Sequence, residues 1–196
     1  MSHIDESQEA LNEIKASLGW RVVYAWVGDD PCGDGDLPPW SGVTCTTVSG
    51  GDYRVVTELD LHNNKLTGPI PPQIGRLKHL KILNLRWNKL QDSIPPEIGE
   101  LKQLTHLYLS FNNFKGEIPK ELANLPELRY LQLHENRLTG RIPPELGTLP
   151  NLRHLSTMET YQPDMNDQVF TQDERRSEAT FMSYASSQCD MGNWFL

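Results

Sequence analysis

The sequence lacks the features that mark a membrane-spanning or nucleic-acid-binding protein. No apolar stretch comes near the length of a bilayer span, so no membrane insertion is expected. No Lys/Arg-rich run occurs and the formal net charge is −8, which argues against nucleic acid or an anionic membrane as the main partner. The start of the chain has no basic region followed by an apolar one, so no signal peptide is visible. We therefore expect either a cytoplasmic protein or a chain without its targeting segment.

Cysteine is also scarce, with three in 196 residues. Cys32 and Cys45 share one short stretch rich in Gly, Pro and Trp, whereas Cys189 lies alone near the C-terminus. In an oxidising compartment we expect a Cys32–Cys45 disulfide worth roughly 2–3 kcal/mol and a free Cys189. Zinc is the weaker alternative, because neither cysteine has a second Cys or His at a usual ligand spacing. No cofactor is expected.

A repeat of 24 residues dominates the middle of the chain. Four asparagines recur at this spacing, each after a segment with alternating apolar positions and each followed six residues later by Ile-Pro: Asn64, Asn88, Asn112 and Asn136. The alternation predicts one short strand per unit, with the apolar side chains in the core and the intervening ones facing outward. The Ile-Pro pair stops regular helix and predicts a tight convex turn. Successive strands then stack in parallel, and the asparagines form a structural ladder between turns.

Three regions follow from this pattern. Residues 1–52 are expected to form an N-terminal cap, in which an amphipathic helix over 5–18 and the cysteine pair cover the first core layer. Residues 53–155 hold four complete units and a partial fifth. The expected fold is an α/β solenoid with a concave parallel sheet of about five strands, a 3-10 or irregular convex side and a helical N-terminal cap.

The third region, residues 156–196, is polar and acidic, with seven Asp/Glu against two Arg, and predicts a disordered tail. In the fifth unit, Thr157 and Thr160 stand where Leu and Asn belong. We therefore expect the last leucine layer to be only partly covered, unless residues 191–196 fold back over it: Leu131, Leu133 and Leu149.

The repeat resembles a known family. The pattern Asn-x-Leu-Thr-Gly-x-Ile-Pro-Pro-x-(Ile/Leu)-Gly-x-Leu, at 64–77 and 136–149, is similar to the plant-type leucine-rich repeat of receptor-kinase ectodomains, receptor-like proteins and polygalacturonase-inhibiting proteins. Asp30-Pro-Cys32 and Trp40-Ser-Gly-Val-Thr-Cys45 resemble the cap that precedes such repeats. The chain departs from the family in the insertion of 33–39 between the two cysteines, in Asp92 where the sibling repeats have Gly, and in the loss of the repeat after Leu155. The last departure suggests a truncated or alternatively spliced member.

The outward strand positions predict a binding surface on the concave face. Trp, Tyr and Arg are enriched at the energetic centres of interfaces, and an exposed Trp87 beside Phe111 forms a contiguous apolar patch. Five strands span roughly 19 Å, about the length of a six-residue extended peptide. The predicted partner-binding residues are Glu58, Asp60, His62, Ile82, Asn84, Arg86, Trp87, His106, Tyr108, Phe111, Tyr130, Gln132 and His134.

The resemblance implies an extracellular, cell-wall or plasma-membrane-associated module that binds a protein or short peptide, such as a receptor kinase, in signalling or defence. An enzyme is not expected. Ser110 and His134 would be neighbours, but Glu135 would point beside His134, and a smooth concave sheet offers no water-excluded pocket. Two alternatives remain open: an inhibitor of a secreted cell-wall-degrading enzyme, and a truncated splice-type isoform with no independent binding function.

Overall fold

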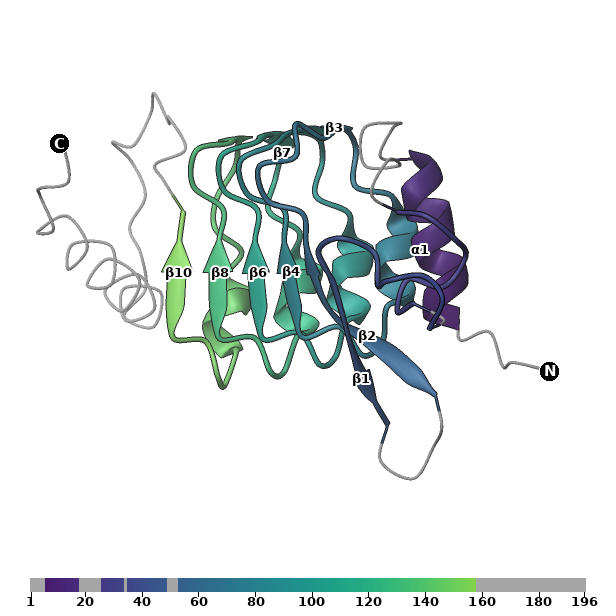
Figure 1. Cartoon of the computed structure of the whole chain (residues 1–196). Helices are drawn as coiled ribbons and strands as arrows, with labels where there is room; N and C mark the ends of the chain where they lie inside the picture. The colour runs from purple at the N-terminus through teal and green to yellow at the C-terminus, as the bar shows by residue number, and fades with distance from the viewer. Residues whose placement is uncertain (1–5, 18–25, 34, 49–52, 158–196) are drawn as a thin grey trace, which may run out of the picture.

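The structure is a computed structural model that describes residues 6–17, 26–33, 35–48 and 53–157. The chain winds into a solenoid with a sheet on its concave side and short 3-10 helices on its convex side (Figure 1). Cys189 and the predicted tail beyond residue 157 lie outside the described residues. No helix among the described residues is both long and apolar enough to cross a membrane.

The concave sheet is parallel over five strands, which confirms the prediction. Its order is β1-β2-β4-β6-β8-β10, and each repeat contributes one strand to it, of seven residues in β2 and of three residues in β4, β6, β8 and β10. In every such strand the central leucine is buried and its two neighbours are half-buried, as in β6 around Leu107. The parallel strands are β2 (Arg54–Asp60), β4 (Ile82–Asn84), β6 (His106–Tyr108), β8 (Tyr130–Gln132) and β10 (His154–Ser156).

The prediction of one strand per repeat was wrong, because each of the four repeats carries a second short strand. These strands pair into a sheet of order β3-β5-β7-β9. They follow the ladder asparagine and extend for only two to four residues, too short for an alternating pattern to show in the sequence. They are β3 (Thr67–Gly68), β5 (Lys89–Asp92), β7 (Asn113–Gly116) and β9 (Arg137–Leu138). A further unpredicted strand, β1 (Val43–Thr47), pairs antiparallel with β2 in a hairpin that projects from the solenoid (Figure 1).

The convex side is a row of 3-10 helices, as expected. Each begins directly after a proline in an extended or near-extended conformation, and in three of them a second proline follows within the first turn. Neighbouring helices approach so closely that a Cβ added at Gly99 would lie 2.3 Å from the backbone oxygen of Glu121. The four are η1 (Pro72–Arg76), η2 (Pro96–Glu100), η3 (Lys120–Asn124) and η4 (Pro144–Thr148).

The asparagine ladder connects successive repeats. The Asn112 side-chain oxygen accepts a bond from the Leu90 N–H at 3.1 Å, and its amide donates to the Leu85 oxygen at 2.8 Å, so one side chain bridges two repeats. Asn88 and Asn136 make the same kind of contacts. Asn64 differs, because it is exposed and, among the described residues, its side-chain amide donates only to the backbone oxygen of His62, at 3.1 Å.

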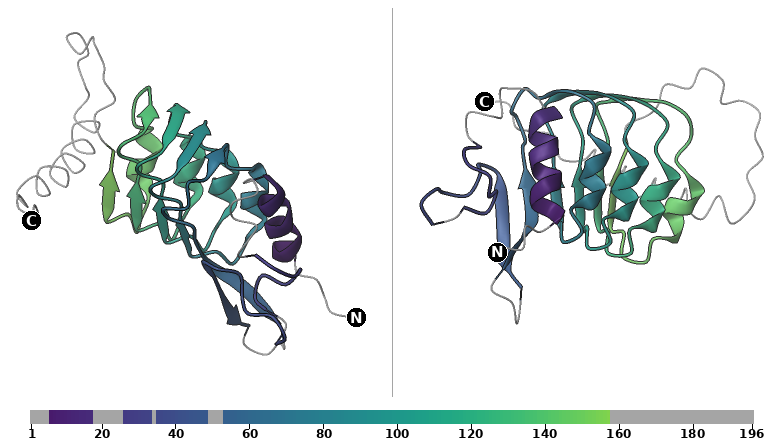
Figure 2. Two further views of the ribbon diagram at one scale, coloured as in Figure 1. Left: turned by 45° about the horizontal axis from the view of Figure 1, so that its top comes forward. Right: turned by 90° about the vertical axis from the view of Figure 1, so that its right-hand side faces the viewer.

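The helix of the N-terminal cap is α1 (Glu6–Ser17), which lies beside η1 at the first end of the solenoid (Figure 2). It buries three apolar side chains against the first core layer: Ala10, Leu11 and Ile14. Arg76 of η1 ties the helix down through Glu13, at 2.8 Å, and Glu9, at 3.2 Å.

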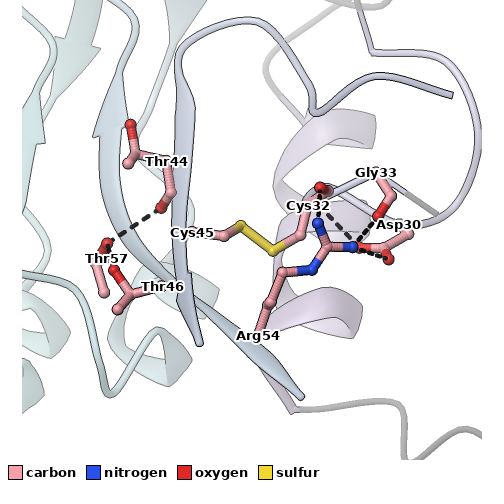
Figure 3. Close-up of a disulfide and its surroundings, with 8 residues drawn as sticks. All are labelled: Asp30, Cys32, Gly33, Thr44, Cys45, Thr46, Arg54 and Thr57. Carbon is pink, nitrogen blue, oxygen red and sulfur yellow. Dashed lines mark hydrogen bonds and ion pairs between the residues drawn. A yellow bond between two sulfur atoms is a disulfide. The ribbon is translucent and has the colours of Figure 1, made fainter. Parts of the chain in front are cut away.

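The second part of the cap is a loop held by aromatic packing and a disulfide. Trp26 stacks on Trp40 with ring centroids 4.7 Å apart, and both rings are buried. Cys32 and Cys45 form a disulfide (Figure 3). The Arg54 guanidinium beside it donates to the backbone oxygens of Cys32 and Gly33. The disulfide thus joins the cap loop covalently to β1.

The C-terminal end differs from the expected arrangement. Leu131, Leu133 and Leu149 are all buried. β10 continues the sheet beyond β8, and the Leu133 N–H donates to the backbone oxygen of Ser156 at 2.8 Å. The expectation that these leucines are only partly covered was therefore wrong. Among the described residues of the last two repeats, the large apolar side chain that is exposed is Ile142, at 37%.

Candidate functional site

The strand register arranges the outward side chains of the concave face in columns. Parallel pairing aligns Tyr108 with Gln132, and His106 with Tyr130. All thirteen residues predicted to bind a partner are exposed or half-buried, and none is fully buried. The first aligned column is Glu58, Ile82, His106, Tyr130 and His154, and the second is Asp60, Asn84, Tyr108, Gln132 and Ser156.

A stacked aromatic pair stands where the concave strands turn toward the second sheet. The rings of Trp87 and Phe111 lie 3.7 Å apart between centroids and are inclined by only 7°. Trp87 is 52% exposed, and Phe111 contacts His134 edge-on at 5.1 Å. The backbone at this corner has a positive φ in every repeat, with values from +54° to +58° at Asn63, Trp87, Phe111 and Glu135.

A second aromatic group lies along the first column of the concave sheet. His106 stacks on Tyr130 with centroids 4.7 Å apart and meets Tyr108 edge-on at 5.7 Å. Burial, and then the charge of Arg129, lowers the pKa of His106. Burial raises the pKa of Tyr108. Both shifts favour the neutral forms of His106 and Tyr108, so the group offers ring faces and edges rather than charge on the concave sheet.

Some polar members of the face serve local turns. The Asp60 carboxylate lies 2.6 Å from Nδ1 of His62 and accepts the His62 N–H at 3.2 Å. Asn84 accepts the Arg86 N–H in the same way, at 3.3 Å. Such bonds to a backbone N–H two residues on stabilise turns. Asp60 and Asn84 therefore have a structural role in addition to any role in binding.

The geometry of a Ser-His pair is not formed. The Ser110 side chain is fully buried, and its hydroxyl has no hydrogen-bond partner among the described residues. His134 instead places Nδ1 2.9 Å from the hydroxyl of Ser156, on the next strand. Within the same part of the chain, no cluster of three His, Cys, Asp or Glu could hold a metal ion.

Two features of the face go beyond the thirteen predicted binding residues. The strand alternation also places His154 in the first column, where its ring centroid lies 6.3 Å from that of Tyr130. The rings of Trp87 and Phe111 lie face to face at a corner with positive φ, and Asn63 alone of the four corner residues is of a type that favours this conformation. In the sequence, the stack is indicated only by the recurrence of an aromatic residue at the same position of two successive repeats.

Comparison with known proteins agrees with the fold. Residues 52–182, more than half of the chain, match the family model described as a leucine-rich repeat region. Receptor-like protein 4 of Arabidopsis thaliana is 38% identical over 78 residues, which make up 38% of this chain and 12% of that protein. The chain therefore spans only a small part of this curated relative.

Two solved structures cover most of the chain. The crystal structure of a plant ice-binding protein aligns with a TM-score of 0.68 at 37% identity, over 78% of this chain and 47% of that one. The BIR3–SERK2 complex from Arabidopsis thaliana aligns with a TM-score of 0.66 at 30% identity, over 76% of this chain and 79% of the compared chain.

Proposed function

This chain belongs to the plant leucine-rich repeat family, and we propose that it is a protein- or peptide-binding module of signalling or defence that acts through the aromatic residues of its concave face. The observation that carries the proposal is the Trp87–Phe111 stack, with Trp87 52% exposed. Exposed, contiguous aromatic surface is typical of contact sites, and Trp is enriched among the residues that dominate binding energy.

Folding alone gives no reason for an aromatic residue at this corner. The backbone there has a φ near +57°, which Asn tolerates well and bulky side chains seldom adopt. The first repeat has Asn63 at this position, whereas the next two have Trp87 and Phe111. The fourth repeat has Glu135 there, so the conformation belongs to the repeat, and it is the aromatic side chains that set two of the four corners apart. This supports a role for the pair in recognition.

The size of the module fits a partner that is itself a protein. The chain aligns with 79% of one chain in a solved complex of BIR3 with SERK2. An array of this length therefore occurs in an assembly between proteins. We propose by analogy a plant receptor or a secreted peptide as the partner of this chain.

The test uses purified protein and a panel of plant receptor ectodomains and secreted peptides, with affinities measured by biolayer interferometry. Trp87→Ala should weaken binding by about 2 kcal/mol, close to thirtyfold, while leaving the thermal midpoint nearly unchanged. Tyr53→Ala is the matched control, because Tyr53 is 48% exposed and stands before β2, away from the aromatic pair. The proposal fails if Trp87→Ala binds as the wild type does, or if no member of the panel binds.

A further inference from the structure

The aromatic row at the corner of the solenoid is open at one end. Corner residues of successive repeats line up through the backbone, since the Asn63 N–H donates to the oxygen of Arg86, next to Trp87, at 2.9 Å. Phe111 covers one face of the Trp87 ring, with centroids 3.7 Å apart and an inclination of 7°. Trp87 is nevertheless 52% exposed. Its other face, which looks toward the first repeat, is therefore open to solvent.

The first repeat places no ring beside this open face. Asn63 stands at the corner there, exposed and with the same φ of +57° as Trp87. Among the described residues, Phe111 is the only aromatic side chain that stacks on Trp87. The opposite end of the row is closed, because the ring of His134 meets Phe111 edge-on at 5.1 Å. The row therefore has one vacant position, bounded by Trp87 and Asn63.

The charges around the vacancy restrict what can fill it. An aromatic face attracts either another ring or a cation. Lys65 and Lys89 each stand two residues after a corner, both are exposed, and neither pairs with a carboxylate in the part of the chain that the structure describes. Their positive charges disfavour a second cation at this position. The occupant that fits is an uncharged aromatic ring.

We propose that the partner inserts an aromatic side chain, of Phe, Tyr or Trp, into this vacancy and stacks it on the open face of Trp87. This inference rests on the proposed function and names the side chain by which the partner is recognised. Stacked rings attract each other beyond the area that they bury. Because Phe111 already holds the indole from the other side, little freedom of Trp87 is lost on binding.

The experiment begins with peptides selected from a phage-displayed random library against the wild-type protein. The selected peptides should share an aromatic residue. Its replacement by Leu, which keeps an apolar side chain but removes the flat ring, should weaken binding by about two- to tenfold in biolayer interferometry. Unchanged affinity after this replacement would overturn the stacked ring.

The substitution Asn63→Phe tests the vacancy itself, because the protein then fills the position with a ring of its own. The repeat accepts such a residue, since Phe111 has a φ of +58° at the equivalent corner. Binding of the aromatic peptides should fall by about tenfold or more, as expected when a dominant contact is lost. Glu135→Phe is the matched control, because it adds the same ring at a corner with a φ of +54°, at the closed end of the row. It should bind as the wild type does, and thermal unfolding checks that both variants are folded.

A second measurement does not depend on how well Asn63→Phe folds. In the complex of the wild-type protein with a selected peptide, nuclear Overhauser contacts should join the ring protons of the peptide to the indole protons of Trp87. A peptide ring that shows such contacts only to other residues would overturn the inference.

Failure of this inference and failure of the proposed function give different results. Peptides that need Trp87 but bind Asn63→Phe as tightly as the wild type would overturn the inserted ring and leave the proposed function standing. The same holds for Trp87-dependent peptides that contain no aromatic residue. A library with no Trp87-dependent binder would overturn both.

Discussion

The asparagine ladder gives the clearest quantitative prediction, through the substitution Asn112→Ala. Asn112 is 8% exposed, and its side-chain oxygen is the acceptor for the buried Leu90 N–H. Its amide donates to three backbone oxygens, those of Leu85, Leu109 and Ser110. Each of these oxygens keeps a second donor after the substitution: Asn88, Asn136 and Trp87 respectively.

The expected loss of unfolding free energy follows from the difference between the Leu90 N–H, which loses its acceptor, and the three backbone oxygens, which each keep a second donor. The Leu90 N–H is left without a partner, which costs about 1–3 kcal/mol, and the lost bonds to the oxygens add roughly 1 kcal/mol. We therefore expect Asn112→Ala to lower the unfolding free energy by about 2–4 kcal/mol in urea titrations followed by circular dichroism. Asn64→Ala is the matched control, because Asn64 is exposed and its side-chain amide makes a single bond within the part of the chain that the structure describes. It should cost less than about 0.5 kcal/mol.

Equal losses of unfolding free energy in Asn112→Ala and Asn64→Ala would refute this reasoning. Equal losses would mean that the ladder position matters through the conformational preference of asparagine, and not through bonds between repeats. A change in the denaturant slope for Asn112→Ala alone would instead indicate that the repeats no longer unfold together.

Three further predictions concern other parts of the chain. Asp92 has a φ of +66° where the sibling repeats have glycine, so Asp92→Gly should raise the unfolding free energy by about 0.5–1 kcal/mol in urea titrations. Reduction of the Cys32–Cys45 disulfide should cost about 2–3 kcal/mol and lower the thermal midpoint, whereas a double serine variant should not respond to the reductant. Burial lowers the pKa of His106 and His134 in the folded state, so the unfolded chain takes up protons first and stability should fall as the pH drops below about 6.5. Replacing both histidines with Gln should flatten this dependence in unfolding measured at about pH 7.5 and pH 5.5.

Much of the fold could be predicted because the repeat signals are redundant. The 24-residue spacing of Asn64, Asn88, Asn112 and Asn136 sets the length of each turn, and the alternating leucines set which side of each strand faces the core. The columns of the concave face follow directly from this register. Four copies of one pattern constrain the architecture more than any single motif could.

The details of the site could not be predicted, since they depend on conformations that the pattern does not encode. The sequence places Trp87 and Phe111 one repeat apart, but it does not show that their rings stack in parallel at a corner where the backbone φ is positive. The repeat spacing aligns His134 with Ser110, but Nδ1 of His134 lies 2.9 Å from the hydroxyl of Ser156 instead. The burial of the Ser110 hydroxyl likewise depends on how its neighbours pack.

The structural ladder and the candidate site share backbone groups, and this link has a physical consequence. Each inner asparagine donates to the oxygen of the concave-face residue two positions before it: Asn88 to Arg86, Asn112 to Ser110 and Asn136 to His134. The corner residues Trp87 and Phe111 lie between these bonded pairs, so the ladder limits how far their backbone can rotate. A partner that binds the aromatic stack then meets side chains that are already ordered, which lowers the entropy cost of association. A ladder substitution that leaves the protein folded should therefore weaken binding even though the asparagine itself never touches the partner.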